Sequence, residues 1–282
     1  MTIQQASRRG TYRQLAVAAA ATMSLSACVS TEPNPLGADG DPCSVMVKSA
    51  AALPTAATHA ILIDRSGSTE ADDPAAFVPD WAASLRPVIP IGDGAKYLIA
   101  PFAGGRHLSW PETPLVAPQI RGTSRKQAPI RAAVTDCIAQ QVERTMLKPG
   151  VPKKTDILGA FYAAGTQLAS TPGTAKHIYM ATDGYPSEGC AQVKIGRELT
   201  GDDIARIVEG CRSELPQNLR GITITIVGIG TSSSKMHAAQ PGAIASLARL
   251  WDVLCHQMTQ TCTVRTGAPT DDVPTPAAKA AG

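Results

Sequence analysis

Three residues with oxygen-bearing side chains alternate directly after a short apolar run. Asp64, Ser66 and Ser68 follow the residues Ile-Leu-Ile in the stretch HAILIDRSGSTEADDP. Alternate residues of a turn can direct their side chains into one concavity, and hard oxygen donors suit a small cation such as Mg²⁺, which takes oxygen ligands at about 2.0–2.1 Å. Because aspartate and serine in turns also cap helices, this motif alone does not define a metal site.

Two further fragments carry oxygen donors of the same kind. Asp183 and Gly184 follow a second apolar run in KHIYMATDGYPSEGC, and Thr155 precedes a predicted helix in KKTDILGAF. Glycine at position 184 lets the chain turn sharply after the acid. Three loops can then meet at one place.

The predicted strands and helices alternate along the chain. Strands are expected over residues 60–64, 96–102, 177–182 and 222–229, and the stretch RHLSW at 106–110 is expected to add a short edge strand. Helices are expected over 129–146, where Pro129 suits a first helical position, and in ILGAFYAAGTQLA, opened by Thr155 or Asp156. Two more carry apolar stripes over 204–215, after Asp202 and Asp203, and over 244–255. A further helix follows the first strand, among prolines 74, 79 and 87.

This alternation predicts an α/β fold. Strands separated by helices of ten or more residues imply right-handed crossovers and a Rossmann-like, doubly wound, mostly parallel central sheet flanked by helices. In such folds ligands gather at the carboxyl ends of the strands, where Asp64 and Asp183 are expected to lie.

The order of these motifs resembles the von Willebrand factor A (VWA) domain, over residues 55–264. The shared pattern is D-x-S-x-S after a first apolar strand, a threonine before a helix, and an acid followed by glycine after a later strand. The resemblance implies a metal-ion-dependent adhesion site (MIDAS) holding Mg²⁺ or Mn²⁺. Ser66, Ser68 and Thr155 would coordinate the ion directly or nearly so, and Asp64 and Asp183 through water or by switching into direct contact. It also implies one open position, which a carboxylate of a protein partner fills.

Residues 1–27 have the features of an export signal. Their start is basic, the apolar stretch 15–27 is too short to cross a bilayer stably, and the end is built of small residues. The sequence Leu-Ser-Ala-Cys at 25–28 resembles the lipobox of bacterial lipoproteins, which implies that Cys28 is acylated and anchors the protein to a membrane. An ordinary secretory signal with a coincidental cysteine is the alternative. Ser7-Arg8-Arg9 leaves a twin-arginine route open beside the general one, and inner and outer membrane both remain open.

The excess of basic residues is confined to the predicted signal. Three of the 26 basic residues, Arg8, Arg9 and Arg13, lie in the predicted signal, and the 23 others balance the 23 acids of the chain. Nucleic-acid binding needs a concentrated positive surface, so this balance gives no reason to expect a nucleic-acid partner.

Six cysteines remain after Cys28, and an even number in an exported chain predicts disulfides. Fifteen pairings are possible, of which proximity favours Cys190 with Cys211 and Cys255 with Cys262, leaving Cys43 for Cys137. The alternative is that Cys137, Cys211 and Cys255 are buried thiols on helix stripes. No Cys/His spacing suggests zinc, and the five histidines share no ligand spacing.

The sequence thus divides into the signal, a linker over 28–54 that begins with Cys28, the VWA-like domain, and a disordered tail over 265–282. We expect a lipid-anchored, extracytoplasmic protein that binds a protein partner through the metal and is not an enzyme. One alternative is a structural component of an envelope assembly, with a metal site that is degenerate or not used for recognition. A metal-dependent hydrolase is disfavoured, because the chain has no G-x-S-x-G elbow, no histidine placed near Ser66 or Ser68, and no phosphate-cradling glycine loop.

Overall fold

The computed structural model describes residues 41–46, 57–66, 80–105, 108–147, 154–231 and 240–267. All of them belong to the larger of two units of the chain, Asn34–Gly282. The predicted signal, Cys28, Ser68 and most of the predicted linker and tail lie outside the described residues.

The described residues form one sheet of six strands, with the first strand near its centre. The strands are β1 (Ala57–Asp64), β2 (Lys96–Phe102), β3 (Leu115–Val116), β4 (Ala175–Ala181), β5 (Thr223–Ile229) and β6 (Cys262–Thr266). Their order is β3-β2-β1-β4-β5-β6, and every pair is parallel except β2 with β3. This mostly parallel, doubly wound sheet confirms the predicted fold class.

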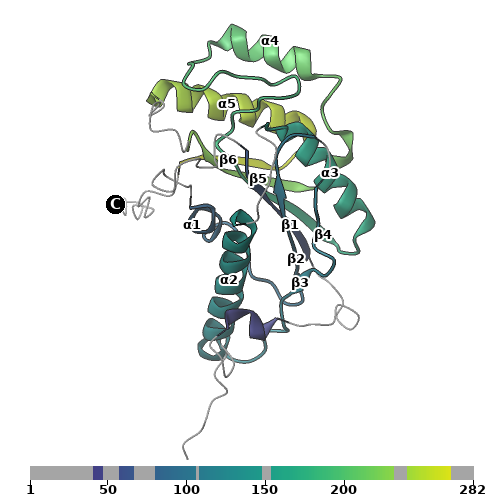
Figure 1. Ribbon diagram of the computed structural model, residues 1–282. Coiled ribbons are helices and arrows are strands. Elements are labelled where there is room, and N and C mark those ends of the chain that lie inside the picture. The colour runs from purple at the N-terminus through teal and green to yellow at the C-terminus, as the bar shows by residue number, and fades with distance from the viewer. Residues whose placement is uncertain are drawn as a thin grey trace, which may run out of the picture. The chain divides into compact units, whose positions relative to one another are not determined.

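Helices cover both faces of this sheet (Figure 1). The helices α1 (Trp81–Leu85) and α2 (Ser124–Met146) pack on one face, and α3 (Ile157–Ser170), α4 (Gly201–Cys211) and α5 (Pro241–Met258) belong to the core on the other. Strand β1 supplies Ile61 and Ile63 to the first core and Ala60 and Leu62 to the second, which is why its sequence is almost continuously apolar. None of the helices in the described ranges is long and apolar enough to cross a membrane.

The strand predictions hold for the central strands and fail at the edges. Strand β2 has the predicted bounds, and β1 begins three residues earlier than predicted. Strand β4 begins two residues earlier and ends one residue earlier, and β5 begins one residue later. Residues 108–110 of the predicted edge strand are not in a strand, and β3 takes the edge position instead. Strand β6 was not predicted, because its five residues are partly or fully exposed and show no buried stripe.

The long helix α2 corrects a second prediction. It begins at Ser124, so Pro129 lies inside the helix and not at its first position. Proline has no N–H to donate to the carbonyl four residues earlier, which here belongs to Arg125. Arg125 is exposed, so water can bind that carbonyl and the helix tolerates the proline.

Within the described residues, three disulfides join these elements, and they confirm the two pairs that proximity favours and the pair that remains. Cys43–Cys137 links the short 3-10 helix η1 (Pro42–Val45) to α2, Cys190–Cys211 links the loop after β4 to the end of α4, and Cys255–Cys262 links α5 to β6. Residues 41–46 fall within the predicted linker, and η1 packs against α2.

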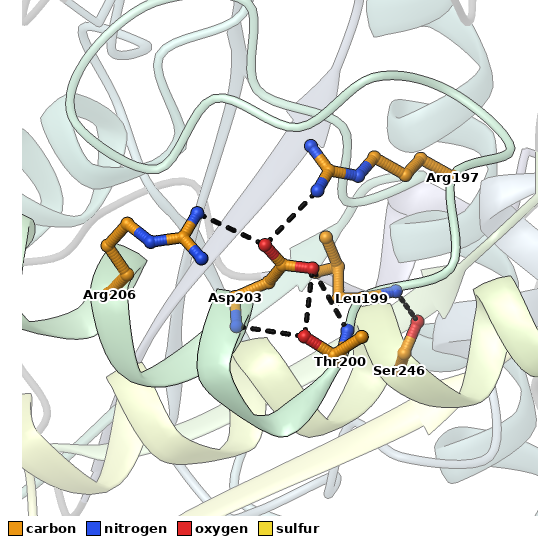
Figure 2. Close-up of polar contacts among 6 residues, drawn as sticks. All are labelled: Arg197, Leu199, Thr200, Asp203, Arg206 and Ser246. Carbon is orange, nitrogen blue, oxygen red and sulfur yellow. Dashed lines mark hydrogen bonds and ion pairs between the residues drawn. The ribbon is translucent and has the colours of Figure 1, made fainter.

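The start of α4 is fixed by a carboxylate that accepts bonds from several directions (Figure 2). Asp203 accepts the N–H of the N-cap Thr200 at 3.2 Å, and the hydroxyl of Thr200 accepts the N–H of Asp203 at 3.2 Å. Arg197 and Arg206 each lie 3.1 Å from the other oxygen of Asp203. The backbone hydrogen bond from Thr200, then its hydroxyl, and the two cations hold the pKa of Asp203 below its usual value. Next to this cap, the N–H of Leu199 donates to the hydroxyl of Ser246 on α5 at 3.0 Å (Figure 2), so the end of the loop that follows β4 is held against α5.

A row of rings lies across the amino-terminal halves of three strands. His59 on β1 stacks between Tyr97 on β2 and His177 on β4, with ring centroids 5.0 Å apart on each side. His59 is 2% exposed, and its Nδ1 has no hydrogen-bond partner among the residues that the structure describes. Burial, and secondarily the neighbouring His177, lowers the pKa of His59 to about 4. These two histidines are therefore packed neutral rings at the opposite ends of the strands from Asp64.

Candidate metal centre

Asp64 is the last residue of β1 and is fully buried. Its Oδ1 accepts the backbone N–H of Ser66 at 2.9 Å, and its Oδ2 accepts the hydroxyl of Thr182 at 2.6 Å. Its carbonyl accepts the indole N–H of Trp81 at 3.3 Å. Burial raises the pKa of Asp64, an effect that the bonds from Thr182 and Ser66 only partly offset. The carboxylate is thus held in one orientation, in surroundings that disfavour an isolated negative charge.

Asp183 follows the end of β4, the strand next to β1 in the sheet. It is fully buried, its Oδ1 accepts the N–H of Tyr185 at 3.0 Å, and its carbonyl accepts the N–H of Gly230 at 2.8 Å. The chain then turns at Gly184, whose φ of +82° favours glycine, as predicted. A Cβ there would lie 2.6 Å from Cδ1 of Ile229 and 3.2 Å from Nε1 of Trp251, so the packing around the turn also requires a residue without a side chain.

Thr155 stands directly before Asp156, the N-cap of α3, and is 2% exposed. The N–H of Asp156 donates to the carbonyl of Ala103, just past the end of β2, at 3.1 Å. The N–H of Thr155 donates to the hydroxyl of Ser187 at 2.8 Å, and its carbonyl accepts the N–H groups of Ser187 and Glu188 at 3.0 Å each. The loop that follows Asp183 therefore touches the segment that carries Thr155.

The structure gathers four of the five predicted ligand residues at the carboxyl end of the sheet. Asp64, Ser66 and Asp183 are buried at the ends of β1 and β4, which the parallel register brings level. Thr155 is buried beside Asp156, whose N–H donates to the carbonyl of Ala103 just past the end of β2. The fifth, Ser68, lies outside the described residues.

Thr182 is a site residue that sequence reasoning missed. Its hydroxyl donates to Asp64 and accepts the N–H of Gly184 at 3.1 Å, so one fully buried side chain joins the two loops. Its signal was its place in the sequence Ala-Thr-Asp-Gly, where a threonine ends a strand directly before the acid.

The side chains present fit a hard divalent cation. Two carboxylates and two hydroxyls provide oxygen donors only, the type that Mg²⁺ and Mn²⁺ take. Burying two carboxylates side by side is costly, and a divalent cation between them would offset that cost. Across the described residues, no three side chains of His, Cys, Asp or Glu form a metal-ligating group.

No protein-family model and no curated protein sequence matches the chain. Among solved structures, it is similar to an aerotolerance-related membrane protein of Bacteroides fragilis, with 15% identity over 76% of this chain and 92% of that one and a TM-score of 0.35. It is also similar to the conserved hypothetical protein BatB of Bacteroides thetaiotaomicron, with 14% identity over 75% and 90% of the two chains and a TM-score of 0.37. A third is a von Willebrand factor type A protein of Catenulispora acidiphila, with 19% identity over 72% and 43% and a TM-score of 0.34. The third carries the name of the family that the motifs resemble.

Proposed function

We propose that the chain is a lipid-anchored, extracytoplasmic VWA-type protein that binds a protein partner through a divalent metal. The metal, Mg²⁺ or Mn²⁺, would be held by Asp64, Ser66, Ser68, Thr155 and Asp183. The observation that carries the proposal is the buried hydrogen bond of 2.6 Å from Thr182 to Asp64, which joins the two acid-bearing strand ends and orients a carboxylate without neutralising it.

The donor set also supports a role in recognition. Only two of the five proposed ligands carry negative charge, so a bound divalent ion would keep net positive charge and attract an incoming carboxylate. We propose that a carboxylate of the partner protein supplies this further ligand. The chain's own contribution is to bury the donor residues Asp64, Ser66, Thr155 and Asp183; the metal, when bound, would supply the positive charge for recognition.

Anchoring at the cell envelope rests on the sequence. Cys28 in the lipobox-like sequence would carry the acyl groups, and the three disulfides suit the oxidising space outside the cytoplasm.

Thermal unfolding of the full-length chain tests the metal part of the proposal. The midpoint is measured in chelator and then in millimolar Mg²⁺ or Mn²⁺, for the wild type, Asp64→Asn, Asp183→Asn and the exposed control Glu143→Gln. A ligand that binds only the folded state at 100 times its Kd stabilises it by about 2.7 kcal/mol, which for a domain of this size is roughly 5–10 °C. We expect this rise in the wild type and the control and not in the two site variants. No rise in the wild type, or an equal rise in Asp64→Asn, contradicts the metal site.

The open position is tested with bound Mn²⁺. A water on the protein-bound ion enhances the relaxation of solvent protons, and acetate that replaces this water lowers the enhancement. We expect a saturable decrease with acetate and none with a matched concentration of chloride. If acetate has no effect while Mn²⁺ stays bound, recognition of a carboxylate is refuted and a structural metal remains.

A further inference from the structure

The backbone of Thr155 is held by one short segment of the loop after β4. Its N–H donates to Oγ of Ser187 at 2.8 Å, and its carbonyl accepts the N–H groups of Ser187 and Glu188 at 3.0 Å each. Beside these bonds, the ammonium of Lys154 lies 2.9 Å from the carboxylate of Glu188. Both polar backbone groups of a candidate ligand residue are therefore fixed by residues 187 and 188.

That segment is itself anchored on both sides. Before it, the indole N–H of Trp251 donates to the carbonyl of Gly184 at 2.8 Å, and Tyr185 is 3% exposed. After it, the Cys190–Cys211 disulfide joins the loop to the end of α4. An anchored segment can transmit a fixed position to Thr155, which a freely moving loop could not.

The hydroxyl of Ser187 is the one side-chain contribution to these three bonds. Thr155 precedes the N-cap of α3, so its N–H lies outside the hydrogen-bond ladder of the helix, and a buried N–H needs an acceptor. Ser187 itself is exposed, so its side chain is not part of either apolar core.

Resting on the proposed function, we propose that Ser187 is a positioning residue for the metal site, which holds Thr155 where its hydroxyl can serve as a ligand. The hydroxyl of Ser187 binds the backbone of Thr155 and not the ion. Removing this hydroxyl leaves all five proposed ligand residues in the chain, but it makes the position of Thr155 less fixed.

Two measurements on the full-length chain test this role. The first is amide hydrogen exchange at Thr155 in metal-free protein, and the second is Mn²⁺ affinity by titration. The variants are Ser187→Ala, Ser187→Thr, which keeps the hydroxyl, and the exposed control Ser213→Ala. We expect Ser187→Ala to speed exchange at Thr155 and to weaken Mn²⁺ binding about 3- to 10-fold, the equivalent of one hydrogen bond. The loss of this one hydrogen bond is also expected to lower the metal-free unfolding midpoint of Ser187→Ala by about 2–4 °C. Ser187→Thr and Ser213→Ala are expected to behave as the wild type.

A double variant separates positioning from a general effect on the protein. If Ser187 acts through Thr155, adding Ser187→Ala to Thr155→Val changes the remaining Mn²⁺ affinity by less than 2-fold. A further loss as large as in the wild type overturns the proposal, as does an unchanged affinity in Ser187→Ala or the failure of Ser187→Thr to restore it. Absence of Mn²⁺ binding in the wild type is a different result, since it refutes the proposed metal site and this role with it.

Discussion

Replacing Thr182 with valine removes the hydroxyl that joins the two strand ends and keeps the shape of the side chain. In the native protein this hydroxyl donates to Oδ2 of Asp64 at 2.6 Å and accepts the N–H of Gly184 at 3.1 Å. Both contacts are buried, so water does not replace either of them.

The magnitude follows from these two lost bonds. A hydrogen bond to a charged acceptor contributes about 1.5–3 kcal/mol, and a buried N–H left without an acceptor costs about 1–3 kcal/mol. Since the two losses share one side chain and Asp64 can take up a proton, we expect Thr182→Val to lower the free energy of unfolding by roughly 2–5 kcal/mol. The pKa of Asp64 is also expected to rise further, because the bond from Thr182 is one of those that lower it.

Urea unfolding in chelator measures the stability loss, and a Mn²⁺ titration measures the effect on the candidate site. Thr182→Ser is the matched control, because it keeps the hydroxyl and gives up one buried methyl group, about 1 kcal/mol. We expect Thr182→Val to lose more stability than Thr182→Ser and to bind Mn²⁺ more weakly. A loss below about 0.5 kcal/mol in Thr182→Val, together with native Mn²⁺ affinity, would refute the role given to this hydroxyl.

Three further predictions concern the framework of the site. Cys43→Ser breaks a disulfide between residues 94 apart in the sequence, and Cys262→Ser breaks one between residues 7 apart. Because a longer closed loop restricts the unfolded chain more, we expect the free energy of unfolding to fall by up to about 4.7 and 2.3 kcal/mol, respectively. Equal losses in urea unfolding would contradict this explanation by chain entropy. His59, with its pKa lowered to about 4, stays neutral in the fold while the unfolded chain binds a proton below pH 6.5. Stability should therefore fall by about 2 kcal/mol between pH 7 and pH 5, and by less in His59→Phe; an unchanged slope in that variant would assign the loss to other groups. Gly184→Ala forces a side chain into the left-handed region and against Ile229, so it should cost about 2–4 kcal/mol in the same assay.

The sequence predicts the centre of this fold better than its edges. Strands β1 and β2 are buried on both faces, so their apolar runs stand out from the surrounding chain. Strand β6 has no such run, and the two residues of β3 are too few for a pattern. The start of α2 was missed because Pro129 looks like a helix start, whereas the exposed first turns before it carry no apolar stripe.

The sequence also predicts some residues of the candidate site and misses others. Asp64, Ser66 and Asp183 are predicted as ligands because each ends or follows an apolar run, and parallel strands bring such positions level. Thr182 and Ser187 act through hydrogen bonds that link residues 118 and 32 positions apart. The place of Thr182 in Ala-Thr-Asp-Gly marks it as a neighbour of the acid, but no local pattern shows that its partner is Asp64 or that the partner of Ser187 is Thr155.

The place of β1 between β2 and β4 has a consequence for the order in which the chain folds. His59 lies opposite Tyr97 on one side and opposite His177, much later in the chain, on the other. Closing the shorter loop costs less entropy, so the β1–β2 pair is expected to form first. Both cysteines of the Cys43–Cys137 bridge also precede β4 in the sequence. The end of the sheet where Asp64 meets Thr182 exists only after β4 has docked. A divalent ion at this site would bind only chains in which β4 has docked. It would therefore stabilise the completed fold and not the partly folded chains that precede it.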